Sequence, residues 1–326
     1  MDRNFFEKTL ERWQELAIRG LRTGEKAECD APDVLERIIV TGMGGSGIVG
    51  DFLSDLANHY SWPFEVLSLK DDRIPFRPRE GDLIFVVSYS GNTLETLSVF
   101  NQSCSASRCI IVTSGGELLS RSIASGKCSL RLSEGLLPRL DLPEILYSIL
   151  SFLTSNYKIP NIKAESLDDS IVIFKEDLKH QVNELAKRFM ISPPILIVSR
   201  PYFSVAIRLK NDLAENSKLY SSIEFLPEAA HNVVEALPYI GDPNRIFIVT
   251  GKYSWGNIYI EAFSKALNGK TSYIELKGDS LLQELIYGYR LSAYISLELS
   301  SLRGLNPCTT ENIDKYKEEL RRVLSH

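Results

Sequence analysis

Short apolar runs alternate with longer amphipathic stretches along the first half of the chain. Residues 1–16 mix charged and apolar positions and predict an amphipathic helix. Five apolar runs with the length of buried strands follow it: Ile38–Thr41, Phe64–Leu67, Leu83–Val87, Ile110–Thr113 and Leu130–Leu132. Strands that alternate with helical stretches are typical of a parallel sheet with helices on both faces, so we predict a doubly wound α/β fold.

A polar stretch at residues 155–166 interrupts this alternation and predicts a boundary between a first domain, 1–157, and a second, 158–326. The pattern then repeats. The segment IIVTGMGGSG that begins at Ile38 aligns with ILIVSRPYFS at Ile195, and DLIFVVSYSG at Asp82 aligns with NRIFIVTGKY at Asn244. We therefore expect both domains to have the same fold.

The turns after the aligned strands differ between the two halves. In the first half they are GMGGSG, residues 42–47, and SYSGNT, residues 88–93, which are small and hydroxylated. In the second half the turns carry larger side chains: Arg200, Pro201, Tyr202, Lys252, Tyr253 and Trp255. Only the first half keeps an open backbone cradle, so we expect an anion site there.

The composition is that of an ordinary globular protein, with 326 residues, 44% of them apolar and 24% charged, and a formal net charge of −5. There is no basic stripe of the kind that nucleic acid binding needs. No apolar run approaches the roughly 20 residues that cross a bilayer, and residues 1–16 do not form a signal-peptide core. We expect a cytoplasmic protein with no nucleic acid or membrane partner.

The cysteines and histidines show no metal-binding pattern. The five cysteines are Cys29, Cys104, Cys109, Cys128 and Cys308. Their number is odd and no CxxC pair occurs, so we expect buried thiols instead of disulfides or a zinc site. The four histidines are His59, His180, His231 and His326, none in HExxH spacing, and no metal ligand is assigned.

Together, the two loops of the first half are suited to a phosphate monoester. A turn from strand to helix supplies backbone N–H groups and the positive end of a helix, and glycines such as Gly45 allow close approach. Four hydroxyl groups add further donors: Ser46, Ser88, Ser90 and Thr93. This set fits a compact dianion better than a pyrophosphate that lies along one loop.

Three other interpretations compete with the phosphate cradle. The spacing Gly42-x-Gly44-x-x-Gly47 after an apolar strand fits a dinucleotide fingerprint, and Asp71 or Asp72 could supply the acidic residue, but SYSGNT has no part in that scheme. A serine nucleophile elbow fails because position 48 is Ile48. Both loops could also be plain tight turns whose serine or threonine caps the next helix.

GMGGSG followed by SYSGNT resembles the sugar isomerase (SIS) domain, and the tandem copies resemble the phosphoglucose isomerase superfamily. The closest resemblance is to the bifunctional phosphoglucose/phosphomannose isomerases. Six segments that span nearly the whole chain carry it: GMGGSGIVGD, SYSGNTLET, LLPRLDLPE, LAENSK, LPEAAHN and NPCTTENIDKYKEEL. The resemblance implies two SIS domains, each a flavodoxin-like parallel sheet flanked by helices.

The same resemblance implies roles for particular residues. The phosphate would be bound by Gly45, Ser46, Ser88, Ser90 and Thr93. Glu215 would be the base, His231 the ring-opening group, Arg139 a charge stabiliser, and Thr310 and Lys317 sugar-facing residues. The usual Pro-Thr pair of the family appears here as Pro-Cys-Thr-Thr. Alignment of Ile313 and Lys317 with the family favours Thr310 and leaves Thr309 open.

Without the resemblance, each of these residues has a plain structural alternative. Glu215 could be a solvated glutamate at a helix end, His231 a core or capping histidine, and Arg139 a surface ion-pair partner of Glu134 or Asp141. Lys317 lies in a charged amphipathic stretch where lysines are usually solvated.

The resemblance therefore implies an isomerase that interconverts glucose 6-phosphate, and mannose 6-phosphate, with fructose 6-phosphate, and we expect it to use no cofactor or metal. The resemblance further implies a homodimer in which His231 reaches the partner's site. The alternative is a non-catalytic SIS regulator that binds phosphosugars, which would need the phosphate loops but not Glu215 and His231.

Overall fold

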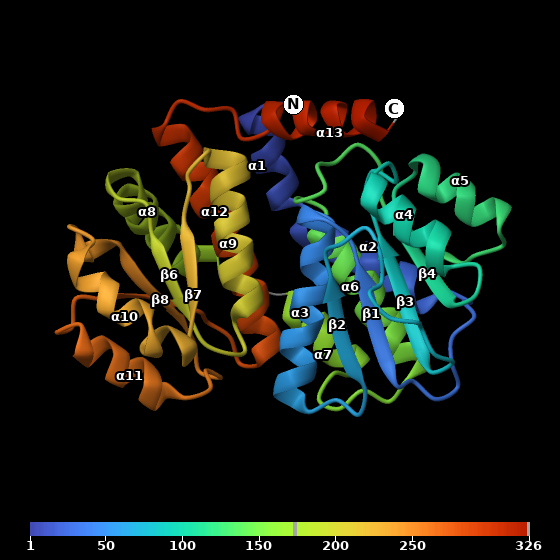
Figure 1. Ribbon diagram of the computed structural model, residues 1–326, viewed down its shortest axis with the longest axis horizontal. Coiled ribbons are helices and arrows are strands. Elements are labelled where there is room, and N and C mark those ends of the chain that lie inside the picture. Colours follow the sequence, from blue (N-terminus) through green and yellow to red (C-terminus); the bar gives the residue numbers. More distant parts are fainter. Residues whose placement is uncertain (172–174, 325–326) are drawn as a thin grey trace.

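The computed structural model describes residues 1–171 and 175–324 and contains two parallel sheets (Figure 1). The first sheet has the order β2-β1-β3-β4-β5. Its strands are β1 (Arg37–Thr41), β2 (Glu65–Leu69), β3 (Asp82–Val87), β4 (Arg108–Thr113) and β5 (Ser129–Arg131). They lie within two residues of the five apolar runs, so the predicted doubly wound sheet is confirmed.

The second sheet has the order β7-β6-β8-β9. Its strands are β6 (Ile195–Val198), β7 (Ser222–Phe225), β8 (Ile246–Thr250) and β9 (Ser272–Glu275). In both sheets the first strand in sequence lies between the second and the third, so the predicted repeat of the fold is confirmed. The division at residues 157 and 158 stays a prediction.

Helices flank both sheets (Figure 1). The α-helices are α1 (Arg3–Glu11), α2 (Trp13–Glu25), α3 (Gly44–Tyr60), α4 (Leu94–Ser103), α5 (Gly116–Ala124), α6 (Leu142–Asn156), α7 (Ala164–Ile171), α8 (Lys175–Ile191), α9 (Phe203–Ser217), α10 (Val233–Ala236), α11 (Asn257–Ala266), α12 (Leu281–Leu302) and α13 (Glu311–Leu324). Short 3₁₀ turns are η1 (Glu228–His231), η2 (Leu237–Tyr239) and η3 (Pro243–Arg245). The opening amphipathic stretch is two helices that meet at Arg12, where the pattern predicted one.

The two halves share one apolar core. Helices α3, α9 and α12 lie between the sheets (Figure 1) and pack against one another. Phe52 of α3 stacks on Tyr289 of α12 with ring centroids 5.1 Å apart, and both side chains are almost completely buried. Because apolar area removed from water is the main source of stability, this shared layer holds the halves together.

Helix α9 runs antiparallel to α3. The backbone N–H of Ser204, near the start of α9, donates to Asp55 Oδ2 in the second half of α3 (2.8 Å). Near the other end of α9, Glu215 approaches Gly44, the first residue of α3. Each helix follows the first strand of its sheet, so the carboxyl edges of the two sheets face opposite ends of this helix pair.

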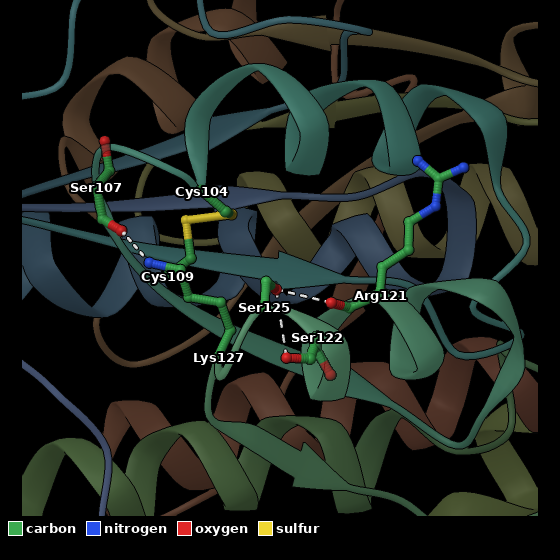
Figure 2. Close-up of a disulfide and its surroundings, with 7 residues drawn as sticks. All are labelled: Cys104, Ser107, Cys109, Arg121, Ser122, Ser125 and Lys127. Carbon is green, nitrogen blue, oxygen red and sulfur yellow. Dashed lines mark hydrogen bonds between the residues drawn. A yellow bond between two sulfur atoms is a disulfide. The ribbon is translucent and has the colours of Figure 1, made fainter.

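Two disulfides correct the expectation of free thiols. Cys29 pairs with Cys128, and Cys104 pairs with Cys109. Figure 2 shows the second pair, which joins the end of α4 to β4 beside Lys127, whose ammonium donates to the Ser107 carbonyl (3.1 Å). Cys308 is a free, buried thiol.

Two findings concern membrane-spanning helices and metal ligands. None of the helices in the described part of the chain has both the length and the apolar character that a membrane crossing requires. The same residues contain no group of three or more histidine, cysteine, aspartate or glutamate side chains that could hold a metal ion. His326 lies outside the described residues.

Candidate active site

The two loops of the predicted phosphate cradle leave the same edge of the first sheet. β1 and β3 are neighbouring parallel strands, with Thr41 opposite Val86. The turns that follow them, GMGGSG and SYSGNT, therefore begin side by side. The strand order changes direction at this pair, which is the position where doubly wound sheets bind ligands.

The first loop leads directly into α3. Gly44, the first residue of that helix, has a φ of +50°, a left-handed conformation that glycine adopts without strain. The N-cap residue, Met43, makes no side-chain hydrogen bond to the helix, so no side chain competes with an anion at its amino end. A Cβ atom on Gly45 would lie 2.8 Å from the Cα of Arg139, so glycine is required for the close approach of that segment.

The second loop is joined to the first by a hydrogen bond. The backbone N–H of Tyr89 donates to Ser46 Oγ (3.1 Å), and both residues are buried. Ser88 Oγ donates to Thr93 Oγ1 (3.0 Å), and Ser90 Oγ accepts from the N–H of Asn92 (3.3 Å). The hydroxyl groups of the predicted cradle thus belong to one connected pair of loops.

Arg139 is buried beside these loops instead of forming a surface ion pair. It lies in the segment between β5 and α6, with 5% of its side chain exposed. Its Nε donates to Asn216 Oδ1 (2.6 Å), and its Nη2 donates to the carbonyl of Pro307 (2.8 Å). Burial lowers the pKa of Arg139, and the nearby Glu215 carboxylate opposes that shift.

Glu215 lies in the last turn of α9 and points toward the first loop and Arg139. Its Oε2 is 3.6 Å from Arg139 Nη1. Its Oε1 is 4.0 Å from the position of a Cβ on Gly44. The side chain is 22% exposed, which is less than expected of a solvated helix-end glutamate and enough to meet a ligand.

A buried ion pair on α9 supports Arg139, and the sequence analysis missed it. Arg208 Nε is 2.7 Å from Asp212 Oδ2, and Arg208 Nη2 donates to the carbonyl of Arg139 (2.6 Å). Burial raises the pKa of Asp212 to about 6, although Arg208 acts in the opposite direction. Arg208, Asp212 and Glu215 recur at helical spacing, and this polar stripe was the available signal.

The segment before α13 contacts the same cluster. Besides the Pro307 carbonyl, the Thr309 carbonyl accepts a hydrogen bond from Lys218 Nζ (2.6 Å), which also donates to the Glu215 carbonyl (2.6 Å). The hydroxyl of Thr309 donates back to the Asn306 carbonyl (3.2 Å). Lys218 is therefore another residue of the site that the sequence analysis missed.

Thr310 and Lys317 are less closely tied to the cluster. Thr310 is half-buried directly before α13, and its carbonyl accepts from the N–H of Asp314 (3.0 Å). Lys317 is exposed on α13, which has no buried residue. The roles assigned to these two residues stay predictions.

His231 lies far from Glu215 within the chain. It is the exposed last residue of η1, which follows β7. Phe225 at the end of β7 packs on Phe203, the first residue of α9, with ring centroids 4.5 Å apart. Glu215 is twelve helical positions further, about 18 Å along the axis. Figure 1 likewise shows α10, which follows η1, well away from the upper end of α9.

In the second sheet, the turn after β8 corresponds to the SYSGNT turn after β3 in the first sheet. A carboxylate of the chain itself, that of Glu284, lies in this turn. Glu284 Oε1 accepts from the backbone N–H of Lys252 (2.9 Å), and its Oε2 accepts from the hydroxyl of Tyr202. A Cβ on Gly251 would lie 2.7 Å from Glu284 Oε2, so the carboxylate fills the turn. Burial raises the pKa values of Glu284 and Tyr202. This occupied turn leaves the open cradle to the first half.

The fold and the site define a tandem SIS-domain protein of the phosphosugar isomerase class. Residues 178–320 match the family described as the bacterial phospho-glucose isomerase C-terminal SIS domain. A hypothetical protein of Thermus thermophilus has the same fold, with a TM-score of 0.70 and 14% identity over 98% of this chain and 91% of that chain.

Curated relatives identify the family. Bifunctional phosphoglucose/phosphomannose isomerases of Aeropyrum pernix and Pyrobaculum calidifontis are similar to this chain. The first is 33% identical over 89% of this chain and 90% of its own, and the second is 30% identical over 95% and 98%. A D-glucosamine-6-phosphate 4-epimerase of Sulfolobus acidocaldarius is 27% identical over 96% and 97%. The chain belongs to the bifunctional phosphoglucose/phosphomannose isomerase family.

Family membership decides between the classes that the sequence left open. The protein is a phosphosugar isomerase, which confirms the predicted enzyme class. The interpretation as an isomerase therefore replaces two alternatives: the dinucleotide-dependent oxidoreductase that the glycine spacing suggested, and the non-catalytic SIS regulator.

Proposed function

We propose that this isomerase interconverts glucose 6-phosphate with fructose 6-phosphate, and mannose 6-phosphate with fructose 6-phosphate. The observation that carries the proposal is the position of Glu215. Its carboxylate lies 3.6 Å from the Arg139 guanidinium. It also approaches Gly44, the first residue of α3, which follows the first phosphate loop. A sugar whose phosphate is bound at that loop would extend toward both groups.

The phosphate is bound by the connected pair of loops. Gly45 and the amino end of α3 supply backbone donors, and four hydroxyl groups surround them: Ser46, Ser88, Ser90 and Thr93. These donors fix one end of the substrate, so that its reacting carbons are oriented relative to Glu215.

The chemistry proceeds in two stages. A proton reaches the ring oxygen and the ring opens, and a proton then moves between C2 and C1 through an enediolate. Glu215 takes the proton from one carbon and returns it to the other, so the carboxylate is regenerated, while the hydroxyl proton moves between O2 and O1. The Arg139 guanidinium, held in place by Asn216 and Pro307, stabilises the negative charge that develops on the enediolate oxygens.

Ring opening is assigned to His231 of a second copy of the chain. Within one chain, His231 follows β7, which packs on the first residue of α9, whereas Glu215 is in the last turn of that helix. An exposed imidazole can both donate and accept a proton, and a dimer with shared sites would bring it to the substrate. The protein is therefore proposed to act as a homodimer.

Sugar recognition is assigned to Thr310 and Lys317. The segment that carries Thr310 is attached to Arg139 through Pro307 and to Lys218 through Thr309, so it lies at the cluster. A small hydroxyl side chain tolerates either configuration at C2, and this is the basis for expecting both epimers. The isomerisation is redox-neutral overall, so the proposal includes no electron-accepting cofactor.

The test is carbon-13 NMR of fructose 6-phosphate incubated with the protein and with Glu215→Gln. With the wild type, signals of glucose and mannose 6-phosphate should appear. With the variant, the rate at which these signals appear should be at least about 100-fold lower. Glu184→Gln, an exposed change on α8, is the matched control and should keep wild-type rates. A mannose rate below detection would exclude the second activity, and full activity of Glu215→Gln would exclude the assigned base.

A further inference from the structure

Tyr89 stands between two predicted phosphate-binding residues, Ser88 and Ser90, but its side chain points away from the loop. It is 5% exposed and reaches the segment between β5 and α6. Its hydroxyl donates to the carbonyl of Ser133 (2.8 Å) and accepts from the backbone N–H of Leu136 (2.7 Å). One hydroxyl group therefore satisfies two backbone groups of that segment.

The backbone of Tyr89 ties the same residue to two further loops. Its N–H donates to Ser46 Oγ in the first phosphate loop (3.1 Å). Its carbonyl accepts from Ser114 Oγ (2.7 Å) and from the Ser114 N–H (3.0 Å), in the turn after β4. A shift of Tyr89 would therefore move several strand-end loops together.

The segment that Tyr89 anchors carries Arg139. Leu136, bonded to the Tyr89 hydroxyl, precedes the arginine by only three positions. Arg139 itself is also held in place. Its carbonyl accepts a hydrogen bond from Arg208 (2.6 Å), and its Cα lies against Gly45. The N–H of Ser133 is bonded to the fully buried Glu144 carboxylate (3.0 Å). The place of Arg139 is thus set by contacts at both ends of a short segment.

We propose that Tyr89 is a positioning residue that couples phosphate binding at the two loops to the placement of Arg139. Phosphate bound at Ser46 and Ser88 would fix the loop that carries Tyr89, and the Tyr89 hydroxyl would transmit this order to the Arg139 segment. The inference rests on the proposed role of Arg139 in the isomerase reaction. Burial raises the pKa of Tyr89 to about 12, so its hydroxyl keeps the proton that it donates to Ser133.

Tyr89→Phe tests the coupling because it removes one oxygen atom and leaves the backbone contact to Ser46. The kcat for fructose 6-phosphate should fall about 10-fold to 100-fold, since Arg139 is no longer held against the reacting carbons. The KM, and the inhibition constant of inorganic phosphate, should stay within about threefold of wild type, since the phosphate loops are intact.

Tyr147→Phe is the matched control. Tyr147 is completely buried on α6, and its hydroxyl is bonded to Ser170 Oγ of α7 (2.6 Å) instead of to the segment that carries Arg139. This variant should lose a similar amount of thermal stability and keep wild-type kcat. A Tyr89→Phe enzyme with kcat within twofold of wild type would overturn the proposal, as would an equal loss of kcat in both variants.

A second measurement uses the wild-type chain and so does not depend on the folding of Tyr89→Phe. Saturating inorganic phosphate should slow amide hydrogen exchange of residues 133–140 at least about threefold, because that segment is tied to the loaded loops. Unchanged exchange at saturation would overturn the coupling. A wild type that does not convert fructose 6-phosphate would instead overturn the proposed function, and phosphate-dependent protection would still report the coupling.

Discussion

Glu215 and Arg139 lie in different halves of the chain, and their side chains meet with Oε2 and Nη1 3.6 Å apart. The arginine comes from the segment before α6 and the glutamate from the last turn of α9. Because Arg139 also bonds Pro307, the pair joins both halves and the segment before α13 at one place. The proposed base and the proposed cation are therefore parts of one buried network.

Arg139→Lys should reduce kcat about 100-fold to 1,000-fold. Lysine keeps the charge but cannot reach Asn216 Oδ1, the Pro307 carbonyl and Glu215 at once. Steady-state kinetics on fructose 6-phosphate is the measurement. Arg131→Lys is the control, since Arg131 forms an exposed pair with Glu134. A kcat within threefold of wild type would show that the guanidinium geometry is not needed.

Mixing Glu215→Gln with His231→Ala should restore activity. If each site takes Glu215 from one chain and His231 from the other, half of the randomly mixed dimers have one intact site, which gives about a quarter of wild-type activity. The assay is turnover before and after subunit exchange. A chain with both changes cannot complement either variant and serves as the control. No recovery after proven exchange would contradict the shared site.

Asp55→Asn should stabilise the protein at neutral pH and have less effect in acid. Burial raises the pKa of Asp55 to about 7, although its hydrogen bonds from Ser204 oppose the shift. An acid whose folded pKa is raised contributes stability that is present below its unfolded pKa, near 4, and is lost as the pH rises to about 7. The wild type should lose up to about 4 kcal/mol relative to the variant between pH 4 and pH 8.

Urea unfolding at a series of pH values measures this difference. The asparagine keeps an oxygen that accepts from the Ser204 N–H, so the comparison isolates the ionisation. Parallel pH profiles of the two proteins would show that Asp55 does not titrate in this range.

Glu284→Ala should destabilise the protein by about 2–4 kcal/mol, since the Lys252 N–H and the Tyr202 hydroxyl lose their partner. Because the empty turn still presents these donors, acetate or inorganic phosphate should raise the melting temperature of the variant more than that of the wild type. Thermal unfolding against chloride at equal ionic strength is the measurement. Equal responses would show that the turn does not bind anions, and Glu284→Gln should lose less stability.

The two disulfides should differ in their contributions. Cys29 and Cys128 are separated by 99 positions, and Cys104 and Cys109 by 5. Loop-closure entropy gives about 4–5 kcal/mol for the long loop and about 2 kcal/mol for the short one. Urea unfolding of the two double-serine variants measures this. A larger loss from the short-loop variant would contradict the entropic account.

The sheets, and the proximity of the two loops that follow β1 and β3, were the predictable parts. Buried parallel strands such as Ile38–Thr41 and Leu83–Val87 are continuous apolar runs, so hydrophobicity alone located them within two residues. Loops that leave adjacent strands of one parallel sheet must lie near each other. The pairing of Ser46 with Tyr89 is a consequence of that topology.

Contacts between distant segments were not predictable from pattern. Nothing in the local sequence relates Arg139 to Glu215 or Cys29 to Cys128, and the first pair was suggested by family resemblance alone. Arg208 and Asp212 resemble an ordinary helical ion pair until the buried face of α9 is known. The break at Arg12 between α1 and α2 was hidden because the polar and apolar positions continue through it.

Helix α9 is fixed at both ends, by Asp55 at Ser204 and by Arg139 at Asn216. An α-helix turns by about 100° for each residue. Insertion or deletion of one residue between these anchors would rotate Glu215 away from Arg139 while leaving composition and hydrophobicity almost unchanged. The number of residues in this helix is therefore as strict a requirement of the site as the identity of the glutamate.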